Sequence, residues 1–290
     1  MDKPRIAIVA PQHPRYPAAN AVLRGVQAAL SARTGGFSTT LYDTCAEAGD
    51  YTAWELEERA FRGIQADPTI AGVICWYQEH GGMVAELCRS GLPLVCIDRL
   101  PEGADCDFVG VDNASGVFQA LTYVFDLGHR KIAHLTHSEA TTAVIARREA
   151  YLSFMNLHAL PMRDEWLCIL PSGSPQDVRQ ALPRLYDSVE TPTALFALND
   201  ALAHTFIAES EKLGHVVPDE MSVIGFDNLE QYTPTPAQLT SIHQPFDLMG
   251  QRAAEILLHR IQQPATTEYV QQYVFLPTEL IERASCRRLA

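Results

Sequence analysis

Asp227 ends the apolar run SVIGF, and its carboxylate has neither a nucleophile beside it nor metal-ligand spacing around it. A carboxylate in this place can accept hydrogen bonds from the hydroxyl or amide groups of a ligand. Polar or aromatic residues follow other apolar runs in the same way: Asn199-Asp200, Asp98-Arg99, Trp76 and the loop from Pro11 to Tyr16. This pattern predicts a site that binds a small molecule.

The residue types needed for bond-breaking chemistry do not form a motif in this sequence. The histidines are dispersed and show no metal-ligand spacing, so no metal site is expected. The nucleophile motif G-x-S-x-G is absent, and the glycine pairs do not form a phosphate-binding loop. We therefore expect a protein that is not an enzyme and that uses no cofactor.

The charge balance of the chain argues against direct nucleic-acid binding. The 290 residues include 22 Lys and Arg against 35 Asp and Glu, a formal net charge of −13, with no basic cluster. The seven cysteines contain no C-x-x-C pair, which indicates free thiols in a reducing compartment. No apolar stretch is long enough for a membrane span or a secretory signal, so we expect a cytoplasmic protein without membrane contact.

The elements that must position these residues alternate along the chain. Short Val/Ile/Leu-rich runs predict strands at RIAIVA, AGVICW, LPLVCID, FVGVD, KIAHLT, TALFAL and MSVIGFD, and amphipathic segments between them predict helices. Apolar strands alternating with helices indicate parallel sheets covered on both faces. The number of strands predicts two doubly wound α/β lobes, with ligand at the carboxyl ends of the strands.

Six segments give the chain a resemblance to a known family. They are LPLVCIDR at Leu92, VGVDNASGVFQALTYVFDLGHRKIAHL at Val109, ARREAY at Ala146, TALFALND at Thr193, KLGHVVPDEMSVIGFDN at Lys212 and LTSIHQPFDLMGQRAAEILLHRI at Leu239. In this order they resemble the effector-binding core of the lac-repressor/galactose-repressor (LacI/GalR) family of bacterial transcription regulators. The resemblance implies the periplasmic-binding-protein type I fold, in which two lobes joined by three crossovers clamp a small molecule.

The resemblance also implies how the chain divides between the lobes. We expect residues 1–112 with 244–271 to form the N-terminal lobe, and 113–243 with 272–290 to form the C-terminal lobe. Family members carry a helix-turn-helix headpiece ahead of the first strand, whereas here the first predicted strand begins at Arg5. We expect no helix-turn-helix domain in this chain, and contact with operator DNA only through such a headpiece.

Three ligand contacts follow from the family pattern. Asp227 matches the family's main acceptor, although Asp also caps turns. Arg147 matches the arginine of R-x-x-G-[FWY], with Ala150 in place of glycine; its fork can give two parallel hydrogen bonds. The alternatives are that Arg147 forms a surface ion pair with Glu149 or Asp126, or that Arg148 makes the ligand contact in place of Arg147. Asn199 matches the ligand-facing asparagine, and Asp200 beside it is more often a helix cap.

Four further ligand contacts are expected from residues that also have structural uses. Gln244 and Phe246 match crossover positions that touch ligand in some relatives, and crossover residues also do structural work. Trp76 and Tyr16 can stack on a sugar ring or a base, or pack in the core. The loop Ser172–Pro175, which often holds an aromatic residue in the family, has none here.

The sequence therefore predicts a regulatory binding module. Its cleft binds a small metabolite, a sugar or sugar derivative, and the module forms a homodimer that controls operator binding. The alternative is a periplasmic-type sugar-binding protein of a transport system, against which the cysteines and the missing signal peptide argue. Both functions require ligand binding and no chemical step.

Overall fold

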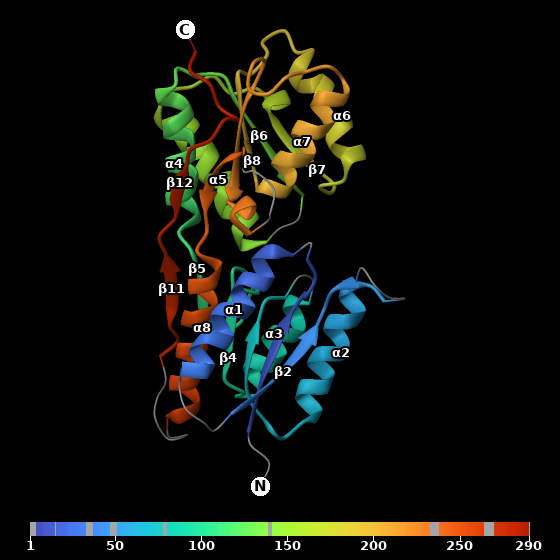
Figure 1. Ribbon diagram of the computed structural model, residues 1–290, viewed down its shortest axis with the longest axis vertical. Coiled ribbons are helices and arrows are strands. Elements are labelled where there is room, and N and C mark those ends of the chain that lie inside the picture. The colour runs from blue at the N-terminus through green and yellow to red at the C-terminus, as the bar shows by residue number, and fades with distance from the viewer. Residues whose placement is uncertain are drawn as a thin grey trace. The chain divides into compact units, whose positions relative to one another are not determined.

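The computed structural model describes residues 4–14, 16–32, 37–46, 51–77, 80–138, 141–232, 238–263 and 270–289. The chain forms two compact units: unit 1 comprises Met1–Val111 and Pro245–Leu276, and unit 2 comprises Asp112–Gln244 and Pro277–Ala290. The chain therefore passes between the units three times. Each unit is an α/β structure with one mainly parallel sheet (Figure 1).

Unit 1 has a six-stranded sheet in the order β11-β5-β4-β3-β1-β2, with every pairing parallel. Its first two strands are neighbours and the third pairs on the other side of the first, so the strand order reverses between β1 and β3. The elements of unit 1 are β1 (Arg5–Ala10), α1 (Pro17–Ala32), β2 (Ser38–Asp43), α2 (Ala53–Ala66), β3 (Ile70–Cys75), α3 (Gly81–Arg89), β4 (Leu94–Ile97), β5 (Asp107–Val111), α8 (Phe246–Gln262) and β11 (Tyr273–Leu276).

Helices cover both faces of this sheet, as its uniformly apolar strands predict. The apolar sides of α2 and α3 pack with Ala7, Val9 and Val73 in one core cluster, and α8 packs on the strands from the other side. Helix α1 lies against α8, where Gly25 and Gly250 allow close contact because a Cβ at either would overlap a backbone carbonyl of the other helix.

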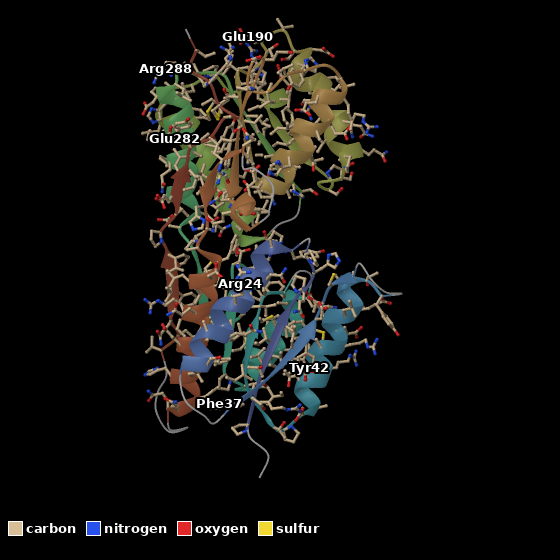
Figure 2. The ribbon with its side chains drawn as sticks, in the orientation of Figure 1. Arg24, Phe37, Tyr42, Glu190, Glu282 and Arg288 are labelled. Atoms are coloured by element: carbon tan, nitrogen blue, oxygen red, sulfur yellow. The ribbon has the colours of Figure 1, made fainter. Side chains whose placement is uncertain are left out.

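The contact between α1 and α8 also has a charged component. Arg24 on α1, labelled in Figure 2, lies 3.2 Å from the Asp247 carboxylate in the first turn of α8. Both side chains are about half exposed, so this ion pair contributes little to stability. The glycine contact and the apolar core therefore hold α8, whose first residue, Phe246, was a predicted ligand contact.

Unit 2 repeats the arrangement, with the strand order β12-β10-β9-β8-β6-β7 and one antiparallel pairing, between β10 and β12. The strand order reverses between β6 and β8. The elements of unit 2 are α4 (Asn113–Asp126), β6 (Ile132–His137), α5 (Thr142–Leu157), η2 (Asp164–Trp166), β7 (Leu167–Leu170), α6 (Pro175–Tyr186), β8 (Ala194–Ala197), α7 (Asp200–Lys212), β9 (Ser222–Asp227), η3 (Leu229–Tyr232), β10 (Thr240–His243) and β12 (Glu279–Ile281).

The core of unit 2 lies between its sheet and two helix layers. Helices α6 and α7 pack through Leu182, Leu185 and Phe206 on one face, and α4 and α5 cover the other face. Gly116 on α4 leaves room for the Phe226 ring at the end of β9, since a Cβ there would collide with the ring. That close approach places the start of α4 beside the end of β9.

The fold confirms two doubly wound lobes joined by three crossovers, and the structure differs from the sequence-based lobe boundaries in detail. The expected boundary after residue 271 assigned Tyr273–Leu276 to the second lobe. In the structure this segment is β11, which pairs in parallel with β5 of unit 1. Strands β2, β7, β10, β11 and β12 were not predicted, because their alternating or short apolar patterns resemble loop sequence. The burial of β2, for example, varies between exposed and intermediate.

Candidate functional site

Asp227 ends β9 at the carboxyl edge of the unit 2 sheet. Its backbone has a φ of 112°, a region that few residues other than glycine adopt. The side chain is 16% exposed, so most of the carboxylate lies within the protein. A partly buried carboxylate requires donors, and the structure supplies two of them from different elements.

The first donor is Arg147 on α5, whose side chain is only 5% exposed. Its Nε donates to Asn113 Oδ1 at 2.7 Å and its Nη1 to the Leu198 carbonyl at 2.8 Å, with Asp227 Oδ1 3.5 Å from the same Nη1. The guanidinium carbon lies 3.7 Å from the centre of the Phe226 ring, a cation–π contact. Arg147 is thus a buried, oriented cation, and the alternative of a surface ion pair with Glu149 or Asp126 is wrong.

The second donor is Gln244, which follows β10. Its Nε2 donates to Asp227 Oδ1 at 2.6 Å, and its backbone N–H lies 3.4 Å from the Asp227 carbonyl. The residue is 2% exposed, and its Oε1 has no hydrogen-bond partner within the described part of the chain. Such a buried acceptor is costly to leave unpaired, and a donor from a bound molecule satisfies it. The structure therefore brings Arg147, Asp227 and Gln244 together as the Asp227 cluster.

Asn199 lies at the carboxyl end of β8, next to the Leu198 carbonyl that Arg147 contacts. Its Oδ1 accepts from the Leu202 backbone N–H at 2.9 Å and caps α7. The expectation that Asp200 is the cap is wrong: α7 begins at Asp200, and this carboxylate is fully buried beneath β9 and β10. Asn199 is half-buried.

Unit 1 presents aromatic residues at the corresponding edge of its own sheet. Trp76 follows β3 and stacks with Phe246 at 5.7 Å between ring centres and 21° between planes. Phe246 is 2% exposed, whereas Trp76 keeps part of its surface exposed. Tyr16 lies in the turn before α1, where its N–H donates to the His13 carbonyl.

Two residues that contact Arg147 of the Asp227 cluster were not predicted from the sequence. Asp112 caps α4 by accepting from the Ser115 N–H at 2.9 Å, while the next residue, Asn113, orients Arg147. Phe226, the apolar residue before Asp227, forms the surface under the guanidinium. Consecutive polar residues at a helix start leave the cap ambiguous, and nothing local in the sequence signals which one faces α5.

His134, like Arg147, is a buried polar residue on the face of the unit 2 sheet that α4 and α5 cover. Its Nδ1 lies 3.0 Å from the Phe196 carbonyl, its ring stacks on Phe196, and its Nε2 has no partner within the described residues. Burial lowers the pKa of His134 to about 4. The ring is therefore neutral at pH 7 and is not a cationic ligand contact.

Metal-ligating side chains do not gather anywhere in the part of the chain that the structure describes. The cysteines there are all unpaired thiols, in agreement with the sequence-based expectation. Among the described helices, none combines the length and apolar character needed to cross a membrane. The chemistry offered by the Asp227 cluster is hydrogen bonding to a polar molecule.

Comparison with known proteins supports this reading of the fold. The model of the periplasmic binding protein-like domain matches residues 121–286. The transcriptional repressor PurR of Mannheimia succiniciproducens is 29% identical over 227 residues, which cover 78% of this chain and 67% of that protein. A putative LacI transcriptional regulator from Bacillus cereus subsp. cytotoxis has the same fold, with a TM-score of 0.81 at 21% identity and full coverage of both chains.

A third relative was solved with a ligand. It is a LacI-family transcriptional regulator from Enterococcus faecium with bound ribose, 28% identical to this chain, with a TM-score of 0.75 and coverage of 99% of this chain and 100% of that one. The relatives found by sequence and by structure are thus named as repressors and regulators. This chain belongs to the periplasmic binding protein-like domain family, and it is similar to regulators of the LacI/GalR type.

Proposed function

We propose that this core binds a sugar or sugar derivative as its effector and that binding changes the affinity of the regulator for operator DNA. The observation that carries the proposal is the Asp227 cluster, in which a partly buried carboxylate, a buried guanidinium and an unpaired amide oxygen occupy one strand edge. Sugar hydroxyls both donate and accept, so they match all three groups. The ribose bound to the Enterococcus faecium regulator supports the same ligand class.

The proposal assigns the effector contacts to seven residues. In unit 2, Asp227 accepts from ligand hydroxyls, while the remaining ligand contacts come from Arg147, Asn199 and Gln244. In unit 1, Trp76 stacks on an apolar ring face, and Tyr16 and Phe246 complete the set. Phe246 is too buried for broad contact, so its main effect is to hold the Trp76 ring in position.

Regulation then requires only a difference in effector affinity between two conformations of the protein. We propose that the protein acts as a homodimer, the commonest symmetric assembly, in the cytoplasm. Sedimentation at micromolar concentration should report a dimer with and without D-ribose. A monomer at all concentrations would contradict this part of the proposal and would favour a transport-type binding protein.

Operator contact is proposed to come from a helix-turn-helix module and not from these residues. The chain has 22 basic against 35 acidic residues, and phosphate contacts by Lys and Arg supply most non-specific DNA affinity. In a fluorescence-anisotropy titration at physiological salt, the 290-residue chain should not bind operator DNA. A version fused to a helix-turn-helix headpiece should bind it in an effector-dependent way. Tight, sequence-selective binding by the unfused chain would reveal a DNA-reading surface of its own.

A thermal-shift screen tests the ligand class. The panel contains D-ribose, other monosaccharides, cellobiose, sugar phosphates and nucleobases, since any specific ligand raises the unfolding temperature by mass action. We expect at least one sugar or sugar derivative to stabilise the wild-type protein and to lose this effect in Asp227→Asn. A shift from nucleobases alone, or the same shift in both proteins, would contradict the proposal.

A further inference from the structure

Asp227 and Asn228 form a turn in an uncommon backbone conformation. The φ angles are 112° at Asp227 and 54° at Asn228, and neither residue is glycine. Two consecutive residues of this kind cost free energy, so the surroundings must hold the turn in place. The turn directs the Asp227 carboxylate toward Arg147 and Gln244.

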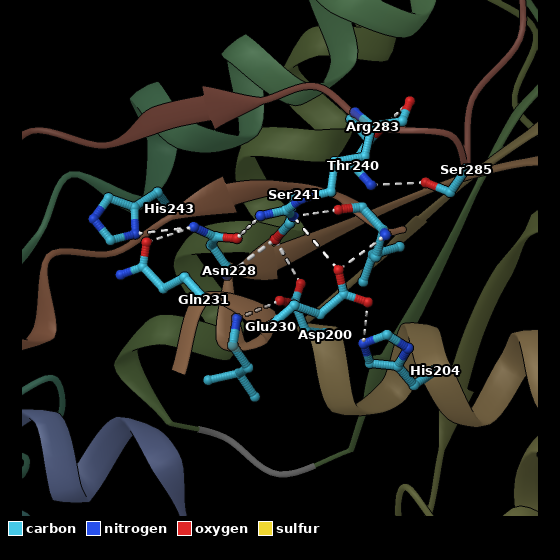
Figure 3. Close-up of polar contacts among 12 residues, drawn as sticks. Asp200, His204, Asn228, Glu230, Gln231, Thr240, Ser241, His243, Arg283 and Ser285 are labelled. Carbon is cyan, nitrogen blue, oxygen red and sulfur yellow. Dashed lines mark hydrogen bonds and ion pairs between the residues drawn. The ribbon is translucent and has the colours of Figure 1, made fainter. Parts of the chain in front are cut away.

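Asp200 lies beneath this turn with its carboxylate fully buried. One oxygen accepts from Ser241 Oγ at 2.5 Å, and the other accepts from the Leu229 backbone N–H at 2.7 Å, directly after the turn (Figure 3). Gly225 makes room for this carboxylate, because a Cβ at that position would overlap it. The Asp200 carboxylate thus binds both the β10 strand and the exit of the turn.

The same serine reaches the turn itself. Ser241 Oγ accepts from the Asn228 backbone N–H at 3.1 Å, so this hydroxyl connects Asp200 with the second residue of the turn. Burial, with the nearby Asp227 charge as a second cause, raises the pKa of Asp200 well above its ordinary value. In a neutral carboxyl group, one oxygen can accept from the Leu229 N–H while the other, as a hydroxyl, donates to Ser241 Oγ. The amide of asparagine can make the same two contacts and is therefore a close substitute.

Arg283 holds the turn from the C-terminal segment that follows β12. Its Nη2 donates to Asn228 Oδ1 at 2.6 Å and its Nη1 to the Leu239 carbonyl at 2.6 Å. Its side chain is 15% exposed and lies 3.7 Å from the Glu230 carboxylate. Asn228 also donates to Gln231 Oε1 at 2.9 Å, so its side chain is held on two sides (Figure 3).

We propose that Asp200, Ser241 and Arg283 are positioning residues that hold the Asp227–Asn228 turn and thereby set the direction of the Asp227 carboxylate. The part of this proposal that concerns ligand affinity rests on the proposed function of Asp227. The contacts of the three residues converge on the turn and its immediate exit, from α7, β10 and the C-terminal segment. Asp200 and Arg283 therefore affect ligand affinity without touching the ligand.

The first test needs no ligand and measures amide hydrogen exchange by NMR in the full chain. Arg283→Met should speed exchange at Asn228 and Leu229 by about tenfold, the effect of losing a hydrogen bond to a charged group. The matched control is Arg288→Met. Arg288 is an exposed arginine of the same segment (Figure 2), and its Nη1 donates to the Asp126 carbonyl. Unchanged exchange in Arg283→Met, or equal changes in both variants, would overturn the proposal.

A conservative variant separates positioning from loss of folding. Asp200→Asn can donate to Ser241 Oγ and accept from Leu229 N–H, so its exchange rates should stay within about twofold of wild type. Asp200→Leu can do neither and should release the turn. Fast exchange in Asp200→Asn comparable with that in Asp200→Leu would contradict the hydrogen-bonding role.

The second test uses D-ribose as the probe in a double-mutant cycle measured by calorimetry. Arg283→Met should weaken ribose binding by about tenfold in the wild-type background, but by less than about twofold when Asp227→Asn is already present. Full additivity would show that Arg283 does not act through Asp227. If the wild-type chain does not bind ribose, the sugar proposal loses this support, and the exchange experiment alone decides whether the turn is held as proposed.

Discussion

The two units have doubly wound sheets of the same size, but the residues at their carboxyl edges differ in kind. Unit 2 places a connected set of charged and amide groups there, with Arg147 and Gln244 both directed at Asp227. Unit 1 places a stacked aromatic pair there, Trp76 on Phe246. The same fold thus presents hydrogen-bonding groups at the sheet edge of unit 2 and an apolar ring surface at the corresponding edge of unit 1.

The difference extends into the interiors. Unit 2 buries Arg147 and His134 on the face covered by α4 and α5, and both make hydrogen bonds to backbone carbonyls of the β8 segment. Unit 1 buries thiols such as Cys75, whose pKa burial raises well above the ordinary value. The thiols stay protonated in mild acid. A histidine that is buried in its neutral form opposes folding in mild acid, because protonation of the imidazole then favours the unfolded chain. Unit 2 therefore carries a buried group that responds to mild acid, and these unit 1 thiols do not.

The largest effect is expected from Arg147→Met. This change keeps the apolar bulk over Phe226 but removes the hydrogen bonds and leaves Asp227 without its buried cation. Breaking a buried pair should lower the free energy of unfolding by about 3 kcal/mol, measured by urea denaturation. Arg148→Met is the matched control and should change it by less than about 0.5 kcal/mol. Equal effects of the two changes would show that Arg147 has no special role in stability and would remove the distinction drawn for unit 2.

The next effect concerns acid stability and His134. The unfolded histidine binds a proton near pH 6.5, whereas the folded one does so near pH 4. Between these values the unfolded chain binds more protons, so the free energy of unfolding falls as the pH falls. Relative to His134→Gln, the wild-type protein should lose about 1.4 kcal/mol per pH unit in this window, measured by urea denaturation at several pH values. A constant difference across the window would contradict a neutral buried imidazole.

The smallest effect is expected in unit 1. Trp76→Leu removes an aromatic face but keeps apolar volume against Phe246. Ring stacking is worth about 0.5–1.5 kcal/mol, so affinity for a stabilising sugar should fall by roughly two- to tenfold in calorimetry. The neighbouring change Tyr77→Leu alters a buried core residue and serves to separate loss of packing from loss of ring contact. An unchanged affinity in Trp76→Leu would limit ligand recognition to unit 2.

Much of the fold could be predicted from the sequence because its central strands are apolar throughout. The runs that begin at Arg5, Lys131, Thr193 and Met221 correspond to β1, β6, β8 and β9. Edge strands escaped prediction, since β2 buries no residue fully and β11 exposes Tyr273 and Phe275. Their pairing depends on partners far along the chain, which local pattern does not report.

The candidate site was predictable in its residue types and less so in its hydrogen bonds. The positions of Asp227 and Asn199 follow from strands that end in polar residues. The use of Asn199 as a helix cap and the burial of Asp200 do not follow from the sequence, because either residue of an Asn-Asp pair can cap a helix. The partners of Arg147 lie 34, 51 and 80 residues away in sequence, so only the folded chain reveals them.

The most direct test of the account is a calorimetric titration of D-ribose and cellobiose into wild-type protein and Asp227→Asn, with exposed Asp187→Asn as the control. We expect one of the sugars to bind the wild-type and control proteins with equal affinity. The Asp227→Asn variant should bind it about tenfold or more weakly, since a hydrogen bond to a charged acceptor is worth roughly 1.5–3 kcal/mol. Equal affinity in a folded Asp227→Asn variant would contradict the claim that the Asp227 cluster binds the effector.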